Sequence, residues 1–225
     1  NNGKVYETLG DATSTIGHRL TGSPNGKKAE EYAFNLFKKY GFSNTKYQPF
    51  VVESWSRDTV SLTLVPEKSD NYVDYEVVAL AHSPVSSHIT GKIVDCGDGL
   101  EEDFEKVKEE VKGKIALFNI NLQLEANKGK KNLHRSEKTA LAIQYGASGV
   151  IIANAVEGGV LLTGTASVTG ELIPIPAVCV SVESGKSMRR WIRDEKNILA
   201  VIDMRNFSRP INARNVIATL PGTSK

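Results

Sequence analysis

Short apolar runs separated by glycine-rich or polar turns recur along the middle of the chain. Two of them, 115–118 and 149–153, are led by glycine, which is typical of buried strands. Between them, residues from about 136 to 145 place apolar side chains on one helical stripe, and Gly146 ends that stripe. The three segments together predict a β-α-β unit whose two strands are parallel.

The N-terminal part has a different pattern. Apolar residues at helical spacing predict a first helix within 3–20 that ends at Gly17. Ser23 and Pro24 suit the start of a second helix, which runs to about Tyr40. The remaining patterns predict strands at 45–52, 59–65, 72–80, 91–97, 174–182, 198–204 and 213–220, helices at 100–111 and 184–192, and a linker at 205–211. We expect the 45–52 strand to pair with residues 214–220.

Composition changes this picture little. The chain has 225 residues, of which 40% are hydrophobic and 24% are charged, and its net charge is +2. These values are ordinary for a globular protein, and so small a net charge does not indicate binding to nucleic acid. No apolar run approaches the roughly 18 residues of a membrane helix, so we expect no membrane span.

Four motifs in the middle of the chain occur in the order typical of one family. VKGKIALF comes first, a lysine-containing helix then leads into YGASGVIIAN, and IPIPAVCVSVESGKSM follows. Together they resemble the protease-associated (PA) domain over about 91–191. The family usually has alanine where this chain has Tyr145, a position on the flank of the predicted helix.

Two further segments are similar to another family. IGHRLTGSPNGKKAEEYAFNLFKKYGF, continuing to Phe50, resembles the opening of the co-catalytic zinc aminopeptidases, which include the glutamate carboxypeptidases. NVIATLPG, near the end, resembles the point where that family re-enters its catalytic domain after an inserted PA domain. In the family, a strand with the first zinc-binding histidine follows shortly, and we expect that strand to lie beyond Lys225.

These resemblances imply a mixed α/β fold: a PA-type β-sandwich or open barrel with flanking helices, beside N-terminal helices and a terminal strand from a truncated peptidase domain. The implied domains are an N-terminal peptidase segment at 1–52, an inserted PA domain at 53–211 and a re-entry strand at 212–225. The implied function is that of a non-catalytic portion and lid of a secreted or periplasmic zinc exopeptidase. Its partners would be the missing catalytic domain and a peptide substrate. A homodimer would form through apolar surface left uncovered on the truncated peptidase segments.

The residues offer little chemistry of their own. The four histidines, His18, His82, His88 and His134, are scattered, and no HExxH or His-x-Asp motif occurs. We therefore expect no zinc and no catalytic residue in this chain, with zinc in the missing catalytic domain. The glycine- and threonine-rich stretch at 158–170 is the nominated substrate-access loop. Its candidate residues are Gly159, Leu161, Leu162, Thr163 and Thr165.

Other interpretations stay open. A free-standing PA-type module that binds peptides or proteins, or a small hydrolase with an unfamiliar site, would fit the same composition. The SGKS segment at 184–187 lacks the leading glycine of a phosphate-binding loop, because Val180 occupies that position. The acidic residues at 98–103 lack the ligand spacing of a calcium loop. Cys96 and Cys179 are expected to be small buried hydrophobes, although spacing alone does not settle their redox state.

Overall fold

The structure is a computed structural model that describes residues 3–66, 72–194 and 198–222. The chain divides into two compact units: Asn1–Ser54 with Ser208–Lys225 form unit 1, and Trp55–Phe207 form unit 2. The helices are α1 (Val5–Ile16), α2 (Pro24–Lys39), α3 (Glu101–Lys106), α4 (Lys108–Val111), the 3-10 turn η1 (Glu125–Asn127), α5 (Arg135–Gln144) and α6 (Val182–Asp194). The strands are β1 (Ser43–Pro66), β2 (Val73–Tyr75), β3 (Val78–Ala79), β4 (Ser86–Asp95), β5 (Ile115–Asn119), β6 (Gly149–Ala153), β7 (Ala177–Val180) and β8 (Ile198–Thr219).

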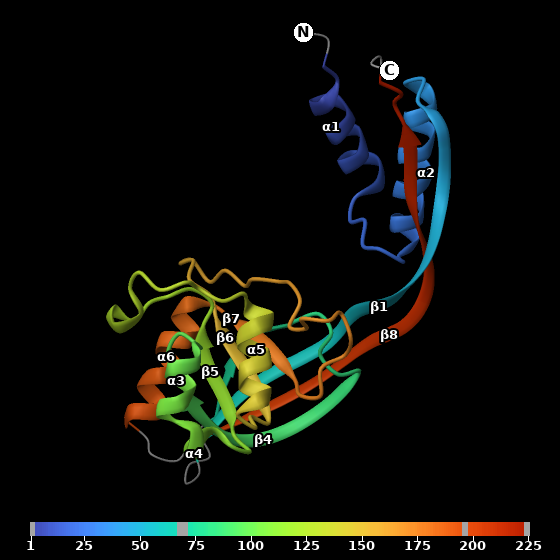
Figure 1. The fold of residues 1–225 in the computed structure, drawn as a ribbon. Coiled ribbons are helices and arrows are strands. Elements are labelled where there is room, and N and C mark those ends of the chain that lie inside the picture. The colour runs from blue at the N-terminus through green and yellow to red at the C-terminus, as the bar shows by residue number, and fades with distance from the viewer. Residues whose placement is uncertain (1–2, 67–71, 195–197, 223–225) are drawn as a thin grey trace. The chain divides into compact units, whose positions relative to one another are not determined.

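The expected mixed fold is confirmed, and its strands join in one mixed sheet. The strand order is β2-β1-β8-β4-β5-β6-β7-β3, and Figure 1 shows the run of the elements. The strands β4, β5, β6 and β7 are parallel neighbours, so the predicted β-α-β unit is present as β5-α5-β6. Since parallel strands need a crossover connection, the helices between them must cover the faces of the sheet.

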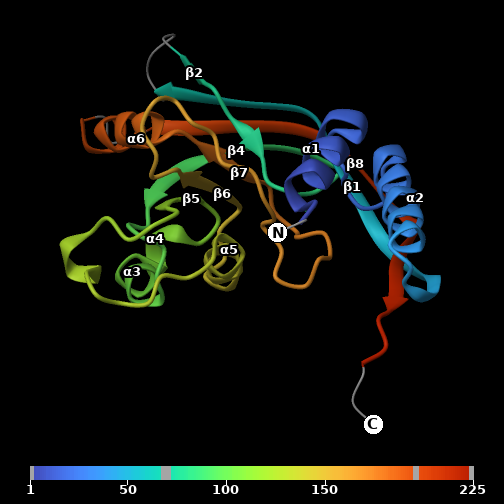
Figure 2. The ribbon, with the colours of Figure 1, turned by 90° about the horizontal axis from the view of Figure 1, so that it is seen from above.

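Alternate side chains of the parallel strands enter two separate cores. On β5, Ile115 and Leu117 join the core that β1, β8 and α6 cover, whereas Ala116 and Phe118 join the core beneath α3, α4 and α5. In Figure 2, α6 and the helices α3 to α5 lie on opposite sides of these strands. Both faces are buried, which explains why the strand sequences read as continuous apolar runs rather than alternating ones.

A glycine sets the close approach of α6 to the sheet. A Cβ atom added at Gly185 would lie 2.5 Å from the Cβ atom of Ala153 on β6. The glycine of the SGKS segment is therefore explained by packing of helix against strand.

The structure corrects three sequence predictions. The segment predicted as a linker, 205–211, lies inside the continuous strand β8. The strand expected over 72–80 is two short strands, β2 and β3, which pair with β1 and β7 respectively. The helix expected over 100–111 breaks at Val107 into α3 and α4. Pairing with distant strands decides the outcome in the first two cases, and a local break in the helix decides it in the third.

Unit 1 consists of α1, α2 and the outer parts of β1 and β8. Ser23 caps α2 as predicted, since its hydroxyl accepts a hydrogen bond from the Gly26 amide at 2.9 Å. Arg214 on β8 donates to the Glu30 carboxylate at 2.7 Å and lies 3.9 Å from the ring centroid of Tyr47 on β1. The expected pairing of 45–52 with 214–220 agrees with the sheet, in which β1 and β8 are neighbours and β8 ends at Thr219.

Candidate functional site

The loops of unit 2 gather at one edge of its parallel strands. Since β4, β5, β6 and β7 are parallel, the segments that follow them leave from the same edge of the sheet. The long segments 120–134 and 154–176 both begin there, and the loops appear above the strands in Figure 1. In open sheets of parallel strands, this carboxyl-terminal edge is where ligands bind.

The segment 155–173, which contains the nominated access loop, is held in place by side chains at three points. The Glu183 carboxylate accepts hydrogen bonds from the amides of Gly158 and Gly159, at 2.7 and 3.3 Å. Asn154 donates to the Val160 carbonyl at 2.8 Å. The loop is therefore preformed rather than loose.

A third tie joins the loop to the segment between β3 and β4. His82 Nδ1 and Thr165 Oγ1 lie 2.8 Å apart, and the Ala81 amide donates to the Gly164 carbonyl at 2.8 Å. His82 has a φ of +69°, in the left-handed region that non-glycine residues seldom adopt. Such conformations persist where the surrounding contacts fix them, and here the contacts are those of the loop.

The nominated residues have different surroundings. Leu162 is half-buried and packs against the core beneath α5, and Thr165 is tied to His82. Gly159 and Thr163 are exposed, while Leu161 is half-buried. The exposed apolar side chains of the segment are different ones: Val156, Val160, Val168 and Leu172, with exposed fractions of 55, 41, 62 and 40%. The assignment of the loop to substrate access stays a prediction.

The second long segment rests on a buried polar cluster. The Asp98 carboxylate is fully buried and accepts hydrogen bonds from the side chains of Asn119 and Asn127, at 2.9 and 3.0 Å. It also accepts from the amides of Gln123 and Leu124, at 2.8 and 2.9 Å. Burial alone would raise the pKa of Asp98, but these four hydrogen bonds lower it overall. The acidic stretch 98–103 is thus a structural support for the turn around η1.

A buried lysine belongs to the same cluster. Lys138 on α5 is fully buried, and its ammonium donates to the carbonyls of Asn119 and Ile120 at 2.9 and 3.0 Å. Burial lowers the pKa of Lys138 to about 8, although Asp98 and Asp103 act in the opposite direction. The lysine therefore fixes the end of β5 to the start of the crossover helix.

The histidines do not come together. His88 pairs with Asp203 at 2.8 Å on an exposed strand surface, and His134 caps α5. Within 3–66, 72–194 and 198–222, no three side chains of the histidine, cysteine, aspartate or glutamate type converge in a way that could hold a metal ion. In those same ranges no helix is long and apolar enough to cross a membrane.

The cysteines are separate and buried. Cys96 directly follows β4 and Cys179 lies on β7, with β5 and β6 between those strands. Three strand spacings of about 4.8 Å place them roughly 14 Å apart, well beyond the reach of a disulfide. Burial raises the pKa of Cys96 to about 12, so its thiol stays protonated and unreactive at neutral pH.

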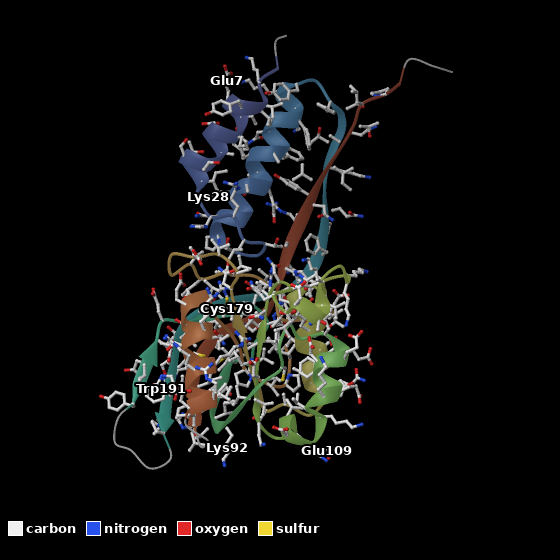
Figure 3. The ribbon with its side chains drawn as sticks, turned by 90° about the vertical axis from the view of Figure 1, so that its left-hand side faces the viewer. Glu7, Lys28, Lys92, Glu109, Cys179 and Trp191 are labelled. Atoms are coloured by element: carbon white, nitrogen blue, oxygen red, sulfur yellow. The ribbon has the colours of Figure 1, made fainter. Side chains whose placement is uncertain are left out.

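Unit 1 exposes apolar side chains. None of the residues of α1 is buried, and Val5, Tyr6 and Leu9 have exposed fractions of 81, 90 and 59%. An apolar groove of about 710 Å³ is lined by Val5, Leu9, Ala12 and Tyr40, among others. Figure 3 shows side chains that project from this helix around the labelled Glu7. A helix with such a surface normally packs against further protein.

Comparison with known proteins gives these features a context. Residues 88–188 match the model of the PA domain family, so the chain contains a PA domain, as the motifs indicated. Carboxypeptidase Q of Mus musculus is 22% identical over 223 residues, covering 98% of this chain and 46% of that protein. Carboxypeptidase Q of Bos taurus is 23% identical over the same length and coverage. The chain spans about half the length of the curated relatives it matches.

Solved structures agree with this similarity. An aminopeptidase from Aneurinibacillus sp. strain AM-1 has a TM-score of 0.70 and 27% identity, covering 98% of this chain and 48% of that one. A zinc aminopeptidase from Bacillus subtilis has a TM-score of 0.62 and 24% identity, with coverage of 98% and 47%. The predicted resemblance to a PA domain together with part of a peptidase is confirmed.

Sequence reasoning missed the residues that hold the loop. Glu183 and Asn154 each look like ordinary polar residues at the end of an apolar run. His82 carries no local signal, because its left-handed conformation comes from pairing with a loop 83 residues away. The strand-end position of Asn154 was the one available signal, since polar residues after parallel strands face the ligand edge.

Proposed function

We propose that this chain is the non-catalytic portion and PA lid of a secreted, zinc-dependent exopeptidase. The observation that carries the proposal is similarity along 98% of the chain to about half of several peptidases. The zinc ions and the residues that activate water would come from the other half of the protein. The loop edge of unit 2 would then shape the access of a peptide to that catalytic half.

The uncovered surface of unit 1 supports a longer protein. The groove along α1 and the exposed Val5, Tyr6 and Leu9 would be covered by the remainder of a peptidase domain. A free-standing peptide-binding module would leave this apolar surface in water, which is unfavourable. That surface therefore favours the peptidase over the module.

The test compares the whole natural protein with the 225-residue chain. Both are incubated with dipeptides and aminoacyl anilides, with added zinc and with a chelator. We expect the whole protein to hydrolyse these substrates only when zinc is present. The 225-residue chain should not hydrolyse them. Hydrolysis by the chain alone, surviving the chelator, would contradict the proposal and favour a small hydrolase. A natural reading frame that ends at Lys225 would favour the binding module.

A further inference from the structure

At the loop edge of unit 2, the guanidinium of Arg135 is paired with none of the residues that the structure describes. Arg135 is the first residue of α5, and its Nε atom is buried without a hydrogen-bond acceptor. Across 3–66, 72–194 and 198–222, no carboxylate forms an ion pair with its guanidinium. A buried donor without an acceptor destabilises the folded state, and more strongly when it is charged. The arrangement is favourable only if something else supplies an acceptor.

The guanidinium lies directly against the access loop. A Cβ atom added at Gly164 would overlap Nη2, Cζ and Nε of Arg135, and the φ of Gly164 is +148°. Any larger residue would displace the arginine, so glycine is required at this position. The charge of Arg135 also acts on the Cys179 thiol on β7, where it partly offsets the rise in pKa that burial causes.

Several acceptors of the loop and of the start of α5 already hold donors of their own. The Gly164 carbonyl accepts from the Ala81 amide, and the Val160 carbonyl accepts from Asn154. The Glu137 carboxylate accepts from the His134 amide at 2.6 Å and closes the start of α5. The Glu183 carboxylate holds the loop glycines. Among the described residues none accepts a hydrogen bond from the guanidinium of Arg135, which stands at the edge where ligands of parallel sheets bind.

We propose that Arg135 binds the terminal carboxylate of a peptide beneath the 155–173 loop. This inference rests on the proposed function and adds a substrate class to it: peptides with a free carboxyl end. A guanidinium suits this ligand because its planar donors match the two oxygens of a carboxylate. Gly164 leaves the space for the guanidinium. The hydrogen bonds made by Glu183, Asn154 and His82 keep the loop in place beside it.

Kinetics of the whole natural protein test the assignment. Ala-Ala and its C-terminal amide are compared for the wild type, Arg135→Met and Arg135→Lys, with Arg190→Met, an exposed arginine on α6, as the control. We expect Arg135→Met to lower kcat/KM for Ala-Ala by about 10- to 100-fold, through a higher KM. The kcat/KM for the amide should change less than about twofold in Arg135→Met. Lysine should restore part of the loss, since it keeps the charge without the fork.

Two outcomes would overturn the proposal. Equal losses for the acid and the amide would show that Arg135 supports the fold or pairs with a carboxylate elsewhere in the protein. A third substrate, the C-terminal amide of Ala-Glu, separates a terminal carboxylate from a side-chain carboxylate. A loss confined to that substrate would move the site to acidic side chains and contradict the terminal assignment.

A second measurement is independent of peptidase activity. In the 225-residue chain, the buried Nε–H of Arg135 should give a slowly exchanging NMR signal, identified by its absence in Arg135→Lys. Ala-Ala should shift this signal, whereas Ala-Ala amide should not. A shift without peptidase activity in the whole protein would refute the proposed function but keep carboxylate binding. No shift up to the solubility limit of Ala-Ala would overturn the carboxylate site itself.

Discussion

At the scale of single residues, unit 2 places charged groups inside the protein and satisfies nearly all of them. Asp98 is buried with four hydrogen bonds, and Lys138 is buried with two. Such groups stabilise the structure only while each hydrogen bond is made, because an unpaired buried charge is costly. Arg135 differs from them in having no acceptor for its Nε atom.

The lowered pKa of Lys138 makes stability depend on pH. In the folded protein the pKa is about 8, against 10.5 for an ordinary lysine. Between these values the unfolded chain binds more protons, so the contribution of Lys138 to the free energy of unfolding rises with pH. We expect the difference between wild type and Lys138→Met to grow by about 2 kcal/mol from pH 7 to 9.5.

Urea unfolding at the two pH values measures that difference. The comparison with Lys138→Met is needed because Cys96 acts in the opposite direction. The pKa of its thiol is raised to about 12, so its contribution to stability falls once the unfolded thiol ionises near pH 9. Both proteins share this loss, and it cancels. A difference that stays constant with pH would contradict the lowered pKa of Lys138.

At the scale of elements, the loop after β6 is held by a helix. Glu183 lies in the first turn of α6, and its carboxylate holds two consecutive amides of the loop. A carboxylate at this position is also favoured by the dipole of the helix. The tip of the loop is therefore positioned by the same element that packs against the sheet through Gly185 and Met188.

Replacing Glu183 should loosen the loop without unfolding unit 2. In Glu183→Gln, the neutral amide keeps one acceptor oxygen and loses the charge. We expect amide hydrogen exchange at Gly158 and Gly159 to rise about tenfold, the effect of losing about 1.4 kcal/mol. Exchange in β5 and β6 should stay unchanged.

The matched control is Glu157→Gln. Glu157 is an exposed loop residue whose ion pair with Lys186 is long, at 3.8 Å, and such surface pairs contribute little. Its exchange profile should match that of the wild type. Equal effects of the two variants would show that the loop is held by general charge rather than by the hydrogen bonds of Glu183.

At the scale of the whole molecule, the two units differ in how well they bury their apolar residues. Unit 2 has two cores on either side of its parallel strands. In unit 1, α1 has no buried residue. Since the curated relatives are about twice as long as this chain, a longer protein would have material to cover that helix.

The isolated chain should therefore self-associate through α1. We expect analytical ultracentrifugation of the 225-residue chain to show association that increases with concentration, because exposed Val5 and Leu9 are shielded from water in the contact. The double variant Val5→Ser with Leu9→Ser should sediment as a monomer. Val168→Ser, which removes an exposed apolar side chain from unit 2, should associate like the wild type. A wild type that stays monomeric at all concentrations would contradict this expectation.

The sequence by itself determined the parts of this protein that depend on local order. Glycine-led apolar runs predicted β5 and β6, Ser23 and Pro24 predicted the start of α2, and four ordered motifs identified the PA domain. These signals work because capping, turn formation and strand burial depend on a few neighbouring residues. The nominated access loop was chosen from its length and composition, and its role remains a prediction.

Only the tertiary structure decided the contacts between distant residues. The strand β8 pairs with β4 only as far as Arg205, and it continues through the predicted linker beside its other neighbour β1, a partner that local pattern does not reveal. Arg135 and Gly164 are 29 positions apart, and crossover connections bring them to one edge of the sheet. Whether a charge is satisfied depends on every acceptor within reach, so an unpartnered guanidinium becomes visible only once the whole chain is folded.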